Sequence, residues 1–107
     1  MEKFPKYTEA YLGRAQLYLQ YQMWPQAMHD YKQVLQLSPE CGIAHMGIAD
    51  CLAAVGKREE AYASYTHAIE LDKTLIELAL KNRGHCEYKR GKYESALQDF
   101  NQVILCI

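Results

Sequence analysis

Histidine and cysteine are the residues of this chain whose side chains could bind a metal ion or carry out redox chemistry. His45 lies one helical turn after Cys41, a spacing that suits two ligands on one helix face, and His85 is followed directly by Cys86. The four cysteines include no Cys-x-x-Cys pair, however. Cys51 and Cys86 stand 35 residues apart, at equivalent positions of an internal repeat, as small buried residues would. We therefore interpret the cysteines as reduced packing residues and predict no metal site and no cofactor.

The residue pattern also argues against catalysis. None of the four histidines has a carboxylate or serine partner at a helical spacing that would build a catalytic set. No glycine-rich loop could hold a phosphate, because Gly84 and Gly91 fall at an expected helix contact and an expected turn. The sequence therefore predicts a protein that is not an enzyme.

The composition argues against nucleic acids and membranes as partners. The 12 Lys and Arg are balanced by 13 Asp and Glu, and the pI is near 6.4, so no basic surface for a polyanion is indicated. Apolar runs are only a few residues long, and the first residues, Met-Glu-Lys-Phe-Pro, lack the pattern of a signal peptide. We expect a cytoplasmic location by default.

An internal repeat organises the chain. Residues 83–100 have the pattern of a helix end, a tight turn at Gly91 and the start of a second helix. The sequence Ala-Leu-Gln-Asp-Phe at 96–100 matches Ala-Tyr-Ala-Ser-Tyr at 61–65 and Ala-Met-His-Asp-Tyr at 27–31, at separations of 35 and 34 residues. This period indicates a helical hairpin that occurs three times.

On this period and these matches, the chain resembles the tetratricopeptide-repeat family over nearly its whole length. The resemblance implies an all-α, right-handed solenoid of three helical hairpins that form a single array over residues 1–107. We place repeat 1 at about 8–41, repeat 2 at about 42–76 and a truncated repeat 3 at about 77–107. Residues 1–7 would be the tail of an upstream repeat junction.

Equivalent positions of the three repeats predict the packing. A small residue recurs on the leading helix of each hairpin, where it would let the partner helix approach closely; these residues are Ala15, Ala49 and Gly84. An aromatic residue recurs on the trailing helix as Tyr31, Tyr65 and Phe100. Such a ring buries about 150–250 Å², and we expect it to fill the space between one hairpin and the next.

A pair of charged residues changes together between repeats. Arg14 and Asp30 lie 16 residues apart, as do Arg83 and Asp99, whereas the middle repeat has an isoleucine and a serine at these two positions. We hypothesise that each arginine reaches its aspartate across the hairpin, because a half-buried guanidinium lost together with its carboxylate leaves no group unpaired. The alternative is that these residues coincide by chance, since three repeats are too few to exclude it.

Turn and capping residues predict where the helices end. Gly56 and Gly91 stand where a residue just past a helix end takes the left-handed conformation, while the first hairpin turns at residues 21–23 without a glycine. Ser38 and Pro39 suggest a cap and a first-turn proline for the next helix. Residues 74–77 have the spacing of a capping box.

The resemblance also implies a binding surface. In this family the leading helices line a concave groove that receives an extended peptide or a partner's helix. Mapped onto this chain, the groove would present Leu12, Gln16, Ile43, Met46, Asp50, Leu78, Lys81, Asn82, His85 and Lys89. Its middle would be apolar and its third repeat basic, so a partner segment with apolar anchors and an acidic end would be complementary. Alternatively, these residues are ordinary solvated helix faces.

A non-catalytic scaffold or adaptor that binds another protein is therefore the predicted function. One alternative is a purely structural segment of a longer solenoid. Another is an RNA-binding helical repeat, which would need a basic groove. A subset of the family captures the C-terminal carboxylates of heat-shock chaperones with a clamp of lysine, asparagine and arginine. At the clamp positions this chain has Leu12, Gln16, Gly47, Leu78 and Asn82, so we do not expect a chaperone tail as the partner.

The C-terminal residues 100–107 form an apolar run without a polar capping helix. Because a final hairpin cannot bury its outer face alone, three explanations remain open. The chain is a segment of a longer array, it is a truncated form, or it self-associates through Phe100, Val103, Ile104 and Ile107.

Overall fold

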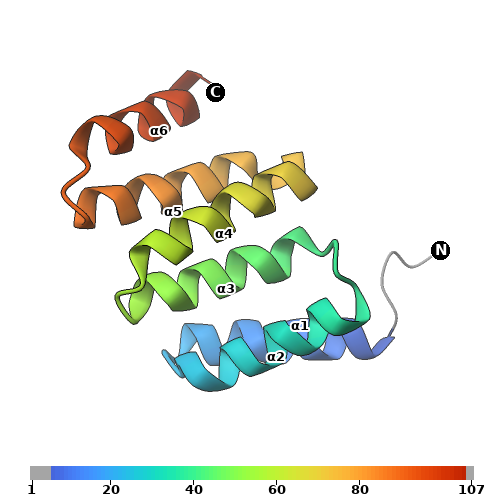
Figure 1. Cartoon of the computed structure of the whole chain (residues 1–107). Coiled ribbons are helices and arrows are strands. Elements are labelled where there is room, and N and C mark those ends of the chain that lie inside the picture. Colours follow the sequence, from blue (N-terminus) through green and yellow to red (C-terminus); the bar gives the residue numbers. More distant parts are fainter. Residues whose placement is uncertain (1–5, 106–107) are drawn as a thin grey trace.

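A computed structural model describes residues 6–105, which form three antiparallel helical hairpins. Figure 1 shows the helices stacked in chain order, from α1 and α2 at the bottom to α6 at the top. The elements are α1 (Lys6–Gln20), α2 (Trp24–Leu37), α3 (Gly42–Ala54), α4 (Arg58–Leu71), the 3₁₀ turn η1 (Lys73–Leu75), α5 (Ile76–Lys89) and α6 (Tyr93–Leu105). The described residues contain no strand, so the predicted all-α solenoid of three hairpins is confirmed.

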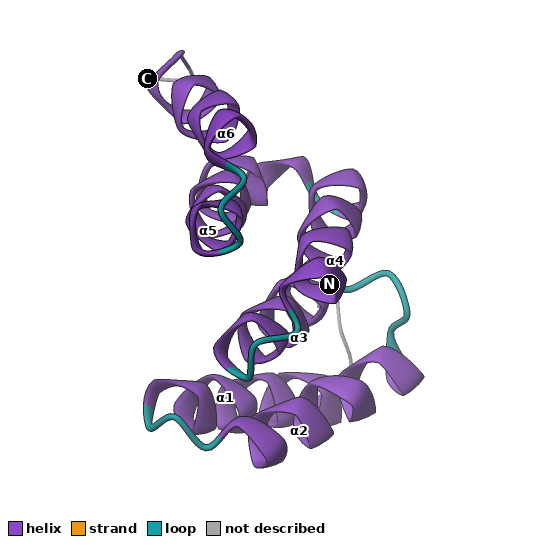
Figure 2. Ribbon diagram, turned by 60° about the vertical axis from the view of Figure 1, so that its left-hand side comes forward, coloured by secondary structure: helices purple, strands orange, loops and turns teal. Residues whose placement is uncertain are grey.

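The hairpins pack through neighbouring helices. Helix α2 of the first hairpin lies against α3 of the second, and α4 of the second lies against α5 of the third. The leading helices α1, α3 and α5 also contact one another in that order, and Figure 2 shows them along one side of the stack. Within residues 6–105, no helix combines the length and the hydrophobicity that a membrane crossing requires.

Small residues bring the two helices of each hairpin together, as predicted. Ala15 and Ala49 are completely buried. In the third hairpin a Cβ added at Gly84 would lie only 3.2 Å from the Cβ of Asp99 and from the Phe100 ring, both on α6. A larger side chain at this column would therefore push the paired helices apart.

The aromatic column lies between hairpins. Tyr31 and Tyr65 are only 1% and 2% exposed, which confirms their predicted burial. The Tyr31 ring of α2 occupies the space where a Cβ of Gly47 on α3 would stand, so this ring fits directly against the next hairpin. Phe100 on the last trailing helix is only half-buried.

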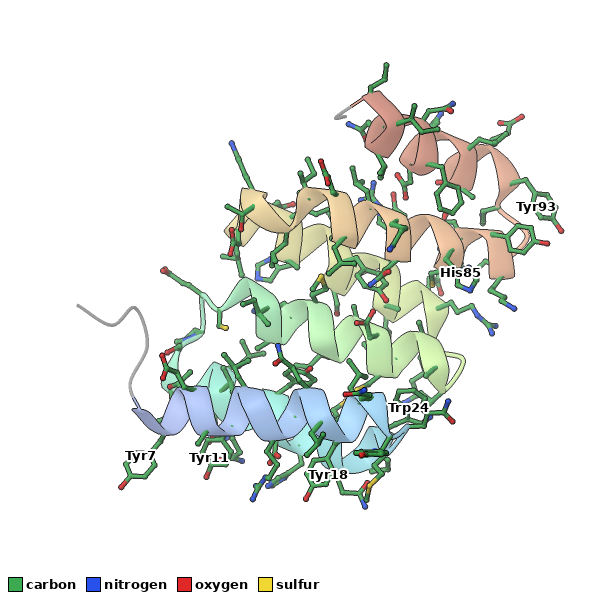
Figure 3. The ribbon with its side chains drawn as sticks, turned by 180° about the vertical axis from the view of Figure 1, so that it is seen from behind. Tyr7, Tyr11, Tyr18, Trp24, His85 and Tyr93 are labelled. Carbon is green, nitrogen blue, oxygen red and sulfur yellow. The ribbon has the colours of Figure 1, made fainter. Side chains whose placement is uncertain are left out.

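Both predicted ion pairs are present. Arg14 donates from Nε and Nη2 to the two carboxylate oxygens of Asp30, at 2.6 and 2.8 Å. Arg83 donates to Asp99 in the same two-pronged way, at 2.9 and 2.7 Å, and its Nη1 also donates to Oγ1 of Thr66 at 2.9 Å. Figure 3 shows Tyr11 and Tyr18 along α1, and the Arg14 guanidinium lies 5.7 and 6.0 Å from the centres of these rings.

The observed turns confirm some of the turns and caps predicted from the sequence. Gly56 and Gly91 have φ angles of 91° and 82°, as expected, and Gln22 takes the equivalent place in the first hairpin with φ of 63°. The side-chain caps expected at Ser38 and Thr74 are absent, and each region contains a separate turn instead.

The first wrong prediction is the cap at Ser38 and Pro39. The Cys41 N–H donates to the Ser38 carbonyl at 3.1 Å and closes a turn, so α3 begins only at Gly42 and has no side-chain cap.

The second is the capping box at residues 74–77. The Asp72 carboxylate accepts from the backbone N–H and the hydroxyl of Thr74, at 3.0 and 2.6 Å, and this local turn outcompetes the expected cap. Most of the predicted N-terminal tail, residues 1–5, and Ile107 lie outside the described residues.

Candidate peptide-binding groove

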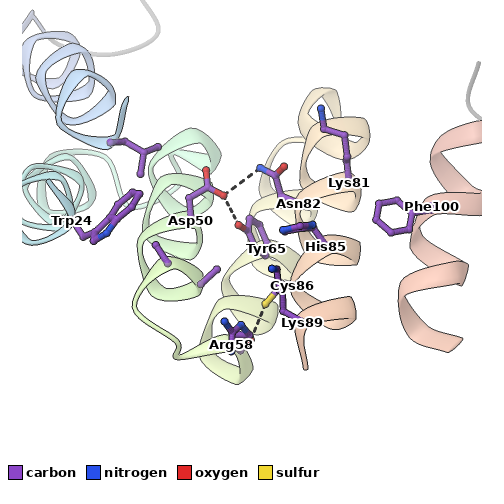
Figure 4. Close-up of a pocket in the computed structure, with 13 residues that line it drawn as sticks. Trp24, Asp50, Arg58, Tyr65, Lys81, Asn82, His85, Cys86, Lys89 and Phe100 are labelled. Atoms are coloured by element: carbon purple, nitrogen blue, oxygen red, sulfur yellow. Dashed lines mark hydrogen bonds between the residues drawn. The ribbon is translucent and has the colours of Figure 1, made fainter. Parts of the chain in front are cut away.

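A groove of about 670 Å³ runs along the side of the array where the leading helices lie (Figure 4). It takes residues from all six helices, and this spread shows that the stacking of the three hairpins creates it. The lining residues are Leu19, Trp24, Asp50, Ala53, Ala54, Arg58, Tyr65, Lys81, Asn82, His85, Cys86, Lys89 and Phe100.

Asp50 joins three helices beneath the groove. Its Oδ1 accepts a hydrogen bond from the Tyr65 hydroxyl of α4 and another, at 3.2 Å, from the Asn82 side chain of α5 (Figure 4). Burial raises the pKa of Asp50, while the two donated hydrogen bonds act in the opposite direction. This carboxylate is therefore already engaged within the protein and does not offer a free negative charge.

The charges that face the groove are mainly positive. Lys81 and Lys89 are exposed on α5, and Arg58 lies at the start of α4. His85, on the same helix as the two lysines, is also exposed. Since Asp50 is the single acidic residue among the lining residues, the groove carries a net positive charge.

Apolar side chains stand at the two ends of this basic strip. Trp24, at the start of α2, and Leu19 of α1 line one side, while Phe100 of α6 lies on the other (Figure 4). Ala53 and Ala54 of α3 also line the groove. The arrangement therefore provides hydrogen-bond donors and cations between two apolar contacts.

Comparison with known proteins identifies the repeat. A family model described as tetratricopeptide repeat matches residues 44–75. Human tetratricopeptide repeat protein 6 is 30% identical over 103 residues, which is 94% of this chain and 20% of that protein. These two matches support the assignment of the chain to the tetratricopeptide-repeat family. It spans about a fifth of the length of this curated relative.

Solved tetratricopeptide-repeat structures have the same fold. The structure described as the second repeat domain of Spaghetti (RPAP3) bound to the HSP90 peptide SRMEEVD has a TM-score of 0.83 at 24% identity, covering 94% of this chain and 92% of that one. The TPR2B domain of yeast Sti1, in a complex with an Hsp70 peptide, has a TM-score of 0.85 at 23% identity and covers 92% of this chain and 78% of that one. At 23–24% sequence identity, these two structures show that the chain shares their fold.

Half of the groove residues predicted for this tetratricopeptide-repeat chain do line the observed groove. These are Asp50, Lys81, Asn82, His85 and Lys89, which come from α3 and α5. The structure therefore brings together the predicted residues of the third repeat and one residue of the second.

The other predicted residues lie elsewhere. Leu12 and Met46 are each only 9% exposed and belong to the two hydrophobic cores, and Ile43 is partly buried against the first core. Gln16 and Leu78 are exposed but do not line the groove. The expected apolar middle is consequently part of the packing, and the apolar contacts of the groove come from other residues.

Several groove residues were missed because they lie at or near the starts of the trailing helices. Trp24 and Arg58 follow the hairpin turns, and both line the groove together with residues of the leading helices. From the sequence, Phe100 was assigned to packing between hairpins and, in one alternative, to self-association. The signal that could have found it is its position in the last repeat, where no later hairpin of the described residues covers the ring.

Two buried thiols, Cys51 and Cys86, lie in the second and third hairpins. Burial raises the pKa of Cys51 to about 11 and also raises the pKa of Cys86, so both remain protonated at neutral pH. Among residues 6–105, no three His, Cys, Asp or Glu side chains lie close enough to hold a metal ion. The groove is thus suited to recognition by charge, hydrogen bonds and apolar contact.

Proposed function

We propose that this chain is a non-catalytic protein–protein interaction module whose groove binds an acidic peptide segment. The observation that carries the proposal is the imbalance of charge in the groove. Lys81, Lys89 and Arg58 face it, whereas its single carboxylate, on Asp50, is occupied by two internal donors. An acidic segment would pair with these cations, and an apolar side chain in it would contact Trp24.

The structural neighbours support the class of ligand. One neighbour is bound to the peptide SRMEEVD, which contains three acidic side chains. These neighbours do not support the expectation that chaperone tails are poor partners. We include such tails among the candidate acidic ligands. In this chain the acidic groups would have to meet Lys81, Lys89 and Arg58, because the clamp positions carry other residues.

Fluorescence anisotropy with labelled peptides tests the proposal. The probes are SRMEEVD and a neutral version in which Gln and Asn replace the acidic residues. We expect the acidic probe to bind more tightly and to lose affinity as salt rises, since exposed charge pairs are screened. Replacing Lys81 and Lys89 by glutamate should weaken its binding about tenfold or more, because attraction becomes repulsion at two sites.

Lys32→Glu with Lys73→Glu is the matched control, because it changes the net charge equally at exposed positions that do not line the groove. Equal loss of binding in the control and in the groove variant would contradict a specific site. Equal binding of the acidic and neutral probes would refute recognition by charge. If neither probe binds, the result would favour the alternative that these repeats are purely structural.

A further inference from the structure

The contact between α2 and α3 defines how one hairpin fits the next. Tyr31 of α2 lies on Gly47 of α3, where its ring leaves no room for a Cβ atom. The neighbours of Gly47 on this face, Ala44 and Cys51, are completely buried. The trailing helix thus presents an aromatic knob, and the leading helix presents a socket centred on a glycine.

Helix α1 carries a second copy of the socket, and within residues 6–105 no side chain fills it. Gly13 stands 34 residues before Gly47, at the equivalent position of the first repeat, and a Cβ added there would meet nothing within 4 Å. The equivalents of the buried Ala44 and Cys51 are Ala10 and Leu17, which are exposed, Leu17 by 53%. We call Ala10, Gly13 and Leu17 the α1 socket.

Helix α6 carries a second copy of the knob. Its Phe100 packs on Gly84 of the same hairpin, but no later hairpin of the described residues lies against it. Phe100 stands at the position of Tyr31, and Leu97 and Ile104 stand at the positions of Met28 and Leu35. Met28 and Leu35 pack against the first core, whereas Leu97 and Ile104 are 60% and 65% exposed. We call Leu97, Phe100 and Ile104 the α6 knob.

We propose that copies of this chain associate head to tail, with the α6 knob of one copy in the α1 socket of the next. A second copy is the occupant because the two free faces are the two halves of a contact that the chain already makes between α2 and α3. The knob and the socket lie on different surfaces, so the contact is heterologous. It leaves each assembly with a free knob and a free socket, and the product is an open chain of copies that continues the solenoid.

This association uses other residues than the proposed peptide binding, apart from one. None of Ala10, Gly13, Leu17, Leu97 and Ile104 lines the groove. Only Phe100 contributes to both surfaces.

Sedimentation velocity from about 10 µM to about 1 mM protein tests the proposal, because a weak association follows mass action. We expect the average mass to rise with concentration beyond that of a dimer. Gly13→Ala should abolish this rise, because its methyl group would overlap the incoming Phe100 ring as a Cβ at Gly47 would overlap Tyr31. In the isolated copy the methyl meets nothing, so the same variant should melt about 3–6 °C higher through its better helix propensity.

A mixing experiment tests the head-to-tail geometry. Ile104→Glu blocks the knob and keeps the socket, whereas Gly13→Ala blocks the socket and keeps the knob. Each variant alone should be monomeric, and an equimolar mixture should form dimers and nothing larger. Gln102→Glu on α6 and Gln16→Ala on α1 are the matched controls, because both residues are exposed and neither belongs to the α6 knob or the α1 socket. Both controls should associate like the unmodified chain.

Three results would overturn the proposal. One is a mass that stays monomeric up to the highest concentration. Another is association of Gly13→Ala to the same extent as the unmodified chain, which would place the contact elsewhere. The third is a mixture of the two variants that remains monomeric, which would exclude the pairing of knob with socket.

Discussion

The ion pair between Arg83 and Asp99 allows a prediction about stability, because the middle repeat shows which uncharged residues can replace the pair. The arginine side chain is 14% exposed and the aspartate side chain 6% exposed, so each charge depends on the other for compensation. Arg83→Ile would leave a buried carboxylate without its guanidinium and Thr66 without the donor from Nη1. Breaking a buried pair from one side typically costs about 3–5 kcal/mol, and we expect a loss of about 3 kcal/mol in the free energy of unfolding.

Removing both partners should be far less damaging. The middle repeat carries Ile48 and Ser64 at these two positions, so the fold already accommodates the uncharged pair. We expect Arg83→Ile with Asp99→Ser to lose about 1 kcal/mol, because no charge is then left buried. The double variant should therefore be more stable than Arg83→Ile alone by about 2 kcal/mol.

Urea unfolding followed by circular dichroism measures these differences. Trp24, the single tryptophan, lies in the first hairpin and reports unfolding there by its fluorescence. Since repeat arrays can lose a terminal hairpin first, the helical signal of Arg83→Ile should fall at lower urea than the tryptophan signal. Asp99→Ser alone completes the comparison. The reasoning is refuted if the stability losses of Arg83→Ile and Asp99→Ser simply add in the double variant, because the two side chains would then have no coupling energy.

Three further predictions concern single residues. Gln22→Gly should raise the free energy of unfolding by about 0.5–1 kcal/mol, because Gln22 has a φ of 63° that glycine adopts without strain, and a thermal melt will show whether it does. Gly47→Ala should lower it by about 1–3 kcal/mol, since the new methyl overlaps the Tyr31 ring; unchanged urea unfolding would contradict this packing. Burial lowers the pKa of His45 from 6.5, and the nearby His67 lowers it further against a hydrogen bond to a backbone carbonyl. The unfolded chain then binds this proton more tightly, so stability present above pH 6.5 decreases as the pH falls through the lower pKa of the folded state. His45→Gln should flatten this part of the stability profile, and an unaltered profile would exclude His45 as its source.

Much of the fold could be predicted because it repeats. Matched columns located Tyr31 and Tyr65 in the core and paired Arg14 with Asp30, since each position was sampled in more than one hairpin. The groove was harder to predict. Leu12 lies on a leading helix, yet the same helix turn also faces the core, and periodicity alone does not separate the two neighbouring faces.

By itself, the sequence determined the period, the helical hairpins, the small and aromatic columns and the ion pairs. These features depend on the spacing of residue types along the chain, and that spacing can be read directly from the sequence. Only the tertiary structure decided that Trp24, Arg58 and Phe100 meet Lys81 at one groove. It alone also decided that no other part of residues 6–105 covers the faces of Gly13 on α1 and Ile104 on α6. The physical reason is that these properties depend on the angle at which whole hairpins stack, and that angle is set by all the contacts between them together.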